Sequence, residues 1–490
     1  MTVSTVNSPN TEPEQRPKLP LITMLRLGLF QMGLGIMSLL TLGVLNRILI
    51  DELAVLPWVA ATAIAMYQLV SPFKVWCGQL SDNRPIGGYH RTGYVWLGTV
   101  CFTALAFVAL QVVWQLGTSL QTNGWTLGTT VWCVVLGAIF GLYGVTLSVA
   151  STPFAALLVD VSDEDNRSKL VGIVWSMLMV GIVIGAIVSS KLLNTPEICG
   201  TELLNPDALL PNQPANIAQL RTAINPVFTI MPTIVVLLAV MATWGVEKTY
   251  SRFSQRTQYQ DREGEITLGR ALTVLTANRQ TGIFFGFLLL LTISLFMQDA
   301  VLEPYGGEVF GLCISETTQL NAFFGMGTLM GIASTGFLVV PRLGKQRTTG
   351  LGCVLAALCF SLLILAGFQE NVSLLKSGLL FFGLASGMIT AGATSLMLDL
   401  TAAETAGTFI GAWGFSQAIS RGLATILGGA VLNLGKTLFT SPVLAYGLVF
   451  GLQVVGLILS VGLLNRVNVR EFQDNAEKAM TTVMAGELEG

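Results

Sequence analysis

The loop GQLSDNRPIGGYHR, from Gly78 to Arg91, separates two long apolar runs and decides how the chain folds. Asp82 stands at the end of the first run, where its carboxylate can hold Arg91 or the start of the next helix. The stretch GFLVVPRLGKQR, from Gly336, has a glycine and bases at the matching place in the second half, but Val340 replaces the acid. We therefore expect a latch in the first half and a weaker one in the second.

The composition places the chain in a membrane. Of its 490 residues, 52% are hydrophobic and 11% are charged, against roughly 25% charged in ordinary soluble domains. A soluble surface needs many charged side chains. The composition therefore excludes a soluble enzyme, a disordered protein and a nucleic-acid-binding protein, and it makes lipids the main surroundings.

Apolar runs long enough to cross a membrane recur along the chain, since one helical span needs about 20 residues. Their continuity favours helices over a closed barrel, whose strands alternate. Twelve spans are predicted, at about 23–49, 56–78, 93–115, 129–158, 168–191, 225–246, 279–301, 317–341, 349–368, 373–399, 406–432 and 443–465.

The basic residues predict the orientation. Nineteen of the 26 Lys and Arg residues fall on the side of both termini, which the positive-inside rule makes cytoplasmic. The predicted organisation is a disordered tail (1–22), a six-helix bundle (23–247), a cytoplasmic linker (248–278), a second six-helix bundle (279–465) and a C-terminal tail (466–490). An irregular extracytoplasmic loop is expected at 192–224.

An internal repeat relates the two halves. AALLVDVSDEDNRSKLVGIVWS, from Ala155, matches SLMLDLTAAETAGTFIGAWGFS, from Ser395, so that Asp160 corresponds to Asp399. We expect both acids to cap the following helix or to hold bases such as Arg167. Repeated six-helix halves predict two bundles related by pseudo-symmetry.

The loop signature, the repeat and the twelve spans together resemble the major facilitator superfamily. The structural loop motif comprises Gly78, Asp82, Arg84, Arg91, Asp160, Arg167 and Asp399. Four further segments resemble the PucC/LhaA-type bacteriochlorophyll delivery branch of that superfamily: LNRILIDEL (Leu45–Leu53), PFKVWCGQLSD (Pro72–Asp82), QDAVLEPYGGEVFG (Gln298–Gly311) and GTFIGAWGFSQAISRG (Gly407–Gly422). His90 stands where the family's loop commonly has a second Arg.

The resemblance implies an assembly factor for light-harvesting and photosystem complexes that binds or delivers chlorophyll or bacteriochlorophyll. It implies antenna or photosystem subunits and pigment-synthesis machinery as partners. It also implies a thylakoid or a photosynthetic cytoplasmic membrane of a bacterium as the location. The competing interpretation is a secondary active transporter of a small solute or lipid, working by alternating access.

Charges inside spans are costly and usually paired or functional. Arg47 is expected near the outer end of span one, and a pair with Glu303 or Asp299 would act as a gate or clamp; the alternative is snorkelling without a partner. Arg421 lies about 24 Å into span eleven. We expect it to pair with Asp299, or else to contact lipid headgroups.

A magnesium ligand for a pigment would have to be an oxygen, because the one histidine, His90, falls in a loop. The candidates are Gln31, Asn46, Gln68, Gln298, Asn321 and Gln417, together with the carboxylates. Trp413 is the candidate for stacking on a flat macrocycle.

No catalytic constellation, nucleotide-binding loop or metal-ligand cluster is seen in the sequence. We therefore expect no enzyme activity and no nucleotide or metal cofactor. The seven cysteines are expected to be small buried hydrophobes, with a disulfide between Cys199 and Cys313 as the alternative.

Overall fold

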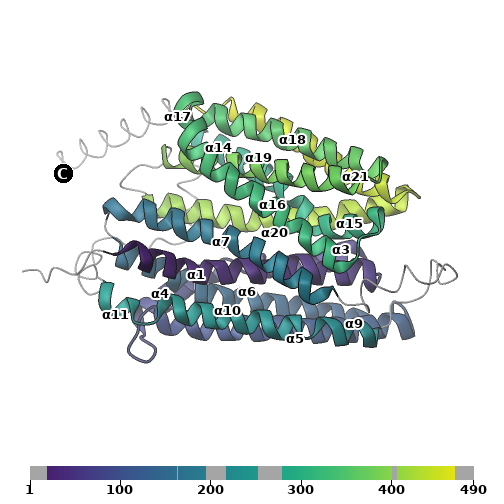
Figure 1. Ribbon diagram of the computed structural model, residues 1–490, viewed down its shortest axis with the longest axis horizontal. Helices are drawn as coiled ribbons and strands as arrows, with labels where there is room; N and C mark the ends of the chain where they lie inside the picture. The colour runs from purple at the N-terminus through teal and green to yellow at the C-terminus, as the bar shows by residue number, and fades with distance from the viewer. Residues whose placement is uncertain (1–18, 163, 195–216, 252–278, 400–405, 469–490) are drawn as a thin grey trace, which may run out of the picture.

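The computed structural model describes residues 19–162, 164–194, 217–251, 279–399 and 406–468 (Figure 1). Among these residues the chain is helical, with a single isolated bridge between Ile86 and Tyr89 as its only β-type pairing. Most of both predicted tails, the linker beyond residue 251 and most of the predicted outer loop lie outside the described residues, but Leu21 and Ile22 of the first predicted tail belong to a helix. The all-α prediction is confirmed.

The first half forms one bundle around its own apolar core, which is built from side chains between Leu19 and Val246 and joined by Ile314. Its elements are α1 (Leu21–Ser38), η1 (Leu39–Val44), α2 (Leu45–Arg47), η2 (Ile48–Glu52), α3 (Pro57–Leu69), α4 (Phe73–Asn83), α5 (Thr92–Asn123), α6 (Leu127–Val161), α7 (Glu164–Leu193), α9 (Ile217–Ile224), α10 (Val227–Thr243) and α11 (Val246–Tyr250). The segments η1 and η2 are π-helical.

The second half forms another bundle, whose core runs from Phe284 to Val467 and takes in Ala61 of the first half. Its elements are α14 (Arg279–Phe296), the 3₁₀ turn η4 (Met297–Ala300), α15 (Leu302–Phe310), α16 (Ile314–Ser334), the π-helical η5 (Thr335–Val339), α17 (Val340–Leu343), α18 (Lys345–Phe368), α19 (Val372–Asp399), α20 (Ala406–Leu438) and α21 (Pro442–Leu464).

Ten helices of the described chain are long and apolar enough to cross a membrane, and each coincides with a predicted span. The two remaining predicted spans are helical too. The segment 56–78 is divided into α3 and α4 by the turn before Phe73, because a residue preceding a proline, here Ser71 before Pro72, disfavours helix. The helix α16 starts with polar residues, which lower its hydropathy. The count of twelve stays a prediction.

The two bundles meet along two seams, where α3 packs on α20 and α7 packs on α16. Figure 1 shows α7, α20 and α16 between the outer helices of the two halves. Glycine makes the contact close: a Cβ on Gly429 would lie 2.6 Å from the carbonyl oxygen of Pro57. Across the other seam, the Ser315 hydroxyl donates to the carbonyl oxygen of Ser190 at 2.7 Å. These seams position the polar residues described next.

Candidate functional site

The loop between α4 and α5 is latched by Arg91, as its motif predicts. The Arg91 guanidinium lies 2.5 Å from the Asp82 carboxylate and 3.0 Å from that of Asp160, and it donates to the Ser81 hydroxyl at 2.6 Å. Glu247 of α11 accepts the backbone N–H of Arg91 at 3.1 Å. The Asp82–Arg91 contact is therefore confirmed, and the latch braces the first bundle.

The other residues of the loop motif lie near this latch. Asp160 holds a base, as expected, and the base shown is Arg91 of the neighbouring loop. A Cβ on Gly78 would lie 3.6 Å from Thr152 Cγ2, and the carbonyl oxygen of Arg84 accepts from the Tyr94 hydroxyl. The side chains of Arg167 and Asp399 lie outside the described residues.

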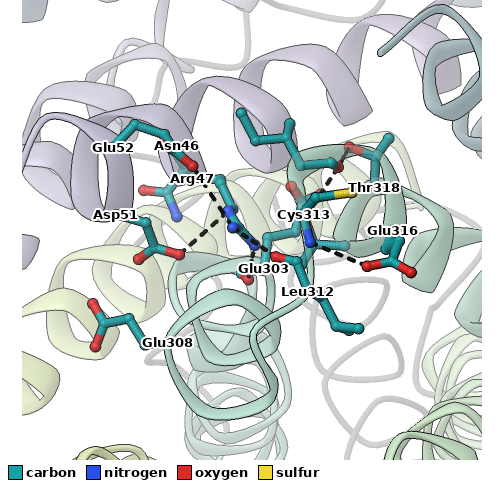
Figure 2. A network of polar contacts seen from close by, with 12 residues as sticks. Asn46, Arg47, Asp51, Glu52, Glu303, Glu308, Leu312, Cys313, Glu316 and Thr318 are labelled. Carbon is teal, nitrogen blue, oxygen red and sulfur yellow. Dashed lines mark hydrogen bonds and ion pairs between the residues drawn. The ribbon is translucent and has the colours of Figure 1, made fainter. Parts of the chain in front are cut away.

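A largely buried polar cluster joins the bundles around Arg47, and we call it the outer network. Figure 2 shows Asn46, Arg47, Asp51, Glu52, Glu303, Glu308 and Leu312. Asn321 joins the cluster through Glu303 and Lys436 joins it through Glu308. Arg47 is only 5% exposed. It donates to the carbonyl oxygens of Glu303 at 3.3 Å and Leu312 at 2.8 Å. Asn46 donates to the carbonyl oxygen of Ala300 at 2.7 Å. Three hydrogen bonds from span one thus cross to the second bundle.

The local backbone makes room for this cluster. The π-helical segments η1 and η2 flank the short α2, which carries Asn46 and Arg47. Turns of π-helix are rare in proteins, and those that occur are often found at functional sites. Glycines face the charges from both sides: a Cβ on Gly307 would lie 2.5 Å from Arg47 Cζ, and one on Gly43 would lie 2.9 Å from Glu303 Cδ. The two bundles can therefore approach each other here because both positions are glycines, which have no side chain.

The prediction that Arg47 pairs with the carboxylate of Glu303 or Asp299 is wrong. Arg47 forms its ion pairs on its own span, with Asp51 at 3.3 Å and Glu52 at 3.7 Å. Glu303 is reached through its backbone, because its side chain accepts from Asn321 at 2.5 Å. The clamp between bundles nevertheless exists, and Arg47 does not snorkel.

Acids outnumber bases in the outer network. Asp51, Glu52, Glu303 and Glu308 face two cations, Arg47 and Lys436, of which Lys436 pairs with Glu308. Asp51, Glu52, Glu308 and Lys436 were not predicted from the sequence. For Asp51 a signal existed, because it stands one helical turn after Arg47.

A second polar group lies where α3, η4 and α20 meet; we call it the seam site, comprising Tyr67, Gln68, Phe296, Gln298, Asp299 and Arg421. Gln68 donates to the Tyr67 hydroxyl at 2.7 Å, and Gln298 donates to Asp299 at 2.6 Å. Both amides are at least nine-tenths buried. Gly422 brings α20 onto α3, since a Cβ there would lie 3.5 Å from Gln68 Cβ.

Arg421 is the exposed member of the seam site. The predicted ion pair with Asp299 is not formed: the Arg421 guanidinium lies over the Phe296 ring, with Cζ 4.0 Å from the ring centroid. Such stacking contributes about 0.5–2 kcal/mol. Phe296 and Tyr67 were not singled out in the sequence, although Phe296 precedes Asp299 by about one turn.

The remaining candidates are spread along the spans. Gln31 is half-buried on α1, and Gln417 is half-buried one turn before Arg421 on α20. The side chain of Trp413 lies outside the described residues. Asn46 and Asn321 belong to the outer network. An open groove of about 560 Å³ lies elsewhere, between α5 and the α9–α10 connection, and contains none of the predicted residues.

One cysteine departs from the expectation of buried free thiols. Cys313, which precedes α16 beside the outer network, is disulfide-bonded. The other five described cysteines are free. The seventh, Cys199, lies outside the described residues. It is the partner that the alternative prediction gave to Cys313.

Two helical bundles, membrane-length helices and polar residues held between the bundles define a multi-pass membrane protein of the major facilitator fold. Solved structures agree on the fold: the nucleoside transporter NupG, in a mutant form, superposes with a TM-score of 0.62 at 12% identity, covering 91% of this chain and 99% of its own. A bacterial homologue of the iron transporter ferroportin in an inward-facing state gives 0.62 at 12% identity, covering 92% and 99%.

The chain belongs to the PUCC protein family, whose profile matches residues 44–472. Protein PucC of Rhodobacter capsulatus is 28% identical over 91% of this chain and 92% of its own length. The bacteriochlorophyll synthase 44.5 kDa chain of Rhodobacter capsulatus is 27% identical over 95% of this chain and 99% of its own. The predicted family is thereby confirmed.

Proposed function

We propose that this protein is an assembly factor that binds chlorophyll or bacteriochlorophyll and delivers it to antenna or photosystem subunits. The observation that carries the proposal is the match, over nearly the whole chain, to a relative named as a chain of bacteriochlorophyll synthase. We assign this chain a binding role without catalysis. Its membrane would be a thylakoid or a photosynthetic cytoplasmic membrane, and pigment-synthesis machinery would supply the cargo.

The seam site offers an oxygen atom that could hold the magnesium of a pigment. His90, the chain's one histidine, lies in the α4–α5 loop with Nδ1 3.3 Å from the Ser81 carbonyl oxygen. An oxygen ligand is therefore required, and magnesium is a hard cation that accepts amide oxygens. The Gln68 Oε1 is buried without a hydrogen-bond partner among the described residues.

Gln68 is the ligand that we favour among the amide candidates. Its Nε2 donates to the Tyr67 hydroxyl, which fixes the amide and leaves Oε1 as the free acceptor. Asn46 has a similarly unpartnered Oδ1, but it lies in the outer network, where charged groups surround it. When bound, the pigment would supply a magnesium ion and a flat apolar ring. The protein would orient it between the bundles and shield it from water.

The test is an absorption spectrum of the tagged protein, mildly solubilised from its native membrane, with mass spectrometry of the pigments and subunits that co-purify. We expect pigment near one per chain, together with antenna or photosystem subunits. Gln68→Leu should lower the pigment content severalfold. Gln453→Leu is the matched control, because Gln453 is also buried with an unpartnered Oε1 but lies on α21. A colourless, partner-free preparation of the unaltered protein would overturn the proposal.

The second candidate function is secondary transport of a small solute or lipid, and it rests on the fold shared with transporters. Such a cycle would need a titratable group between the bundles, and Asp299 of the seam site is the residue placed for it. Saturable solute uptake by vesicles, abolished in Asp299→Asn, would favour this function over pigment delivery.

A further inference from the structure

An open groove lies on the first bundle, where α5 packs against α9 and α10 (Figure 1). Its volume of about 560 Å³ falls within the roughly 300–1,000 Å³ that is usual for ligand sites. Phe107 of α5 forms one wall, and a stripe of α9 and α10 from Arg221 to Ile230 forms the other. The lining residues of the stripe stand four positions apart in two rows, so they share one face of the helical segment.

A positive charge lies at one end of the groove. The exposed Arg221 donates to Gln111 Oε1 at 3.4 Å, and it forms no ion pair within the described part of the chain. A guanidinium has five N–H donors in a planar fork that matches a phosphate. Most donors of Arg221 are therefore left for an anion in the groove.

Asn225 adds a second donor one helical turn after Arg221. Its Oδ1 accepts hydrogen bonds from Trp114 Nε1 at 3.0 Å and from Gln111 Nε2 at 3.3 Å, and these two donors fix the orientation of the amide. The Asn225 Nδ2 donates to no described residue. None of the described residues that line the groove is acidic. This end of the groove therefore presents donors that suit an anion.

The remainder of the groove is mainly apolar and about as long as one leaflet is deep. Arg221 stands four residues after Ile217, where a candidate membrane span begins, and Ile230 follows nine residues later. At 1.5 Å per residue these nine residues cover about 14 Å, and half of a hydrocarbon core of about 30 Å is about 15 Å. Phe107 stands near the middle of α5, 15 residues after Thr92. A charged end at the membrane surface and an apolar wall of this depth match the two parts of a lipid.

We propose that this groove binds one anionic phospholipid, with its phosphate on Arg221 and Asn225 and an acyl chain along Phe107 and Ile230. Basic pockets between membrane helices bind anionic headgroups in this way. The orientation predicted from the basic residues places the lipid in the extracytoplasmic leaflet. Bound there, it bridges α5 to α9 and α10 and stabilises the first bundle. This role is independent of the pigment function proposed above.

The experiment uses the full chain, freed of lipid in a neutral detergent and titrated with phosphatidylglycerol or phosphatidylcholine. Native mass spectrometry counts the bound lipids, and thermal unfolding measures the stabilisation that a ligand of the folded state produces. We expect phosphatidylglycerol to fill one site per chain roughly tenfold more tightly than phosphatidylcholine does. Arg221→Gln should weaken the binding of phosphatidylglycerol roughly tenfold, or about 1.4 kcal/mol, and remove the preference. Without added lipid, this variant should unfold like the unaltered protein, because no lipid then occupies the groove.

Two matched controls separate the groove from the rest of the surface. Lys191→Gln removes an exposed charge from the last turn of α7, on the same predicted side of the membrane but outside the groove, and should leave the preference unchanged. Thr229→Phe places a large side chain in the groove and should weaken the binding of both lipids severalfold. Thr233→Phe makes the same change at an exposed position one turn further along α10, outside the groove, and should leave binding unchanged.

The inference is supported if Arg221→Gln loses the preference for phosphatidylglycerol while Lys191→Gln keeps it. Equal binding of the two lipids to the unaltered protein overturns the inference, since the groove then holds only the lipid that surrounds any membrane protein. A preference that survives in Arg221→Gln, or unchanged binding in Thr229→Phe, overturns it as well. If glycerol 3-phosphate displaces phosphatidylglycerol at equal concentration, the acyl chains contribute nothing, and a soluble anion replaces the lipid as the occupant.

Discussion

Replacing Arg47 by glutamine should separate the bundles at the outer network. The variant loses the two hydrogen bonds to the carbonyl oxygens of Glu303 and Leu312, and it leaves the buried Asp51 carboxylate without its ion pair. Removing one partner of a buried pair costs about 3–5 kcal/mol, because the other charge stays buried and uncompensated. We expect a loss of this size in the free energy of unfolding, measured by SDS titration in mixed micelles.

The matched control is Arg221→Gln. Arg221 lies on α9, exposed, with a single 3.4 Å contact to Gln111, so its loss should change the free energy of unfolding by at most about 0.5 kcal/mol. Asp51→Asn in the Arg47→Gln background should recover part of the loss, because it removes the stranded charge.

Accessibility gives an independent measurement of the same perturbation. Ser315 is 5% exposed at the α7–α16 seam. A cysteine at that position should react slowly with an impermeant maleimide in the unaltered protein and much faster with Arg47→Gln. The reasoning is refuted if Arg47→Gln unfolds at the same SDS concentration as Arg221→Gln and the labelling rate stays unchanged.

Three further predictions concern stability. Gly307→Ala should lower the free energy of unfolding by about 1–3 kcal/mol, because its Cβ would meet the Arg47 guanidinium at 2.5 Å. Gly451→Ala is the control, since its Cβ would have nothing within 4 Å, and it should not destabilise the protein. SDS titration compares the two variants. Arg91→Gln should cost about 3–5 kcal/mol by the same assay, because it removes an ion pair from the buried Asp160 carboxylate as well as the pair with Asp82. Arg342→Gln, exposed in the second half, should be near neutral. Cys313→Ser removes the disulfide and should lower stability by about 2–4 kcal/mol, a loss that dithiothreitol should reproduce in the unaltered protein.

The latch and the positions of ten spans could be predicted because their signals are local. Asp82 and Arg91 stand in one loop, so a helix end and a short turn bring them together whatever the rest of the chain does. The spans follow from runs of apolar residues. The break between α3 and α4 in the second span also has a local signal, Pro72. The break was not predicted because the apolar run continues across it.

The partners of the buried charges could not be predicted. Arg47 bonds to the carbonyl oxygens of Glu303 and Leu312, and a backbone acceptor has no side-chain signature in the sequence. Arg421 stacks on Phe296 instead of pairing with Asp299, and that choice depends on the register of α20 against α14. A charge in an apolar span is conspicuous, so Arg47, Glu303 and Arg421 could be singled out from the sequence, whereas their contacts depend on packing.

The energy needed to open the outer network differs in its consequences for the two candidate functions. Opening the outer side would break two charged hydrogen bonds from Arg47 and one neutral bond from Asn46, at a net cost of roughly 4–7 kcal/mol. A transported solute would have to supply that energy by binding the open state more tightly than the closed state. Changing the ratio of open to closed protein from 1:99 to 99:1 needs a difference of about 5.5 kcal/mol between the two binding free energies. A pigment dissolved in the bilayer, as proposed for an assembly factor, would come to the seam site from the lipid and would need no opening at the outer network. Arg47→Gln should therefore change the rate of solute uptake if the protein is a transporter. If it is an assembly factor, the pigment content should fall only in step with the fraction of folded protein.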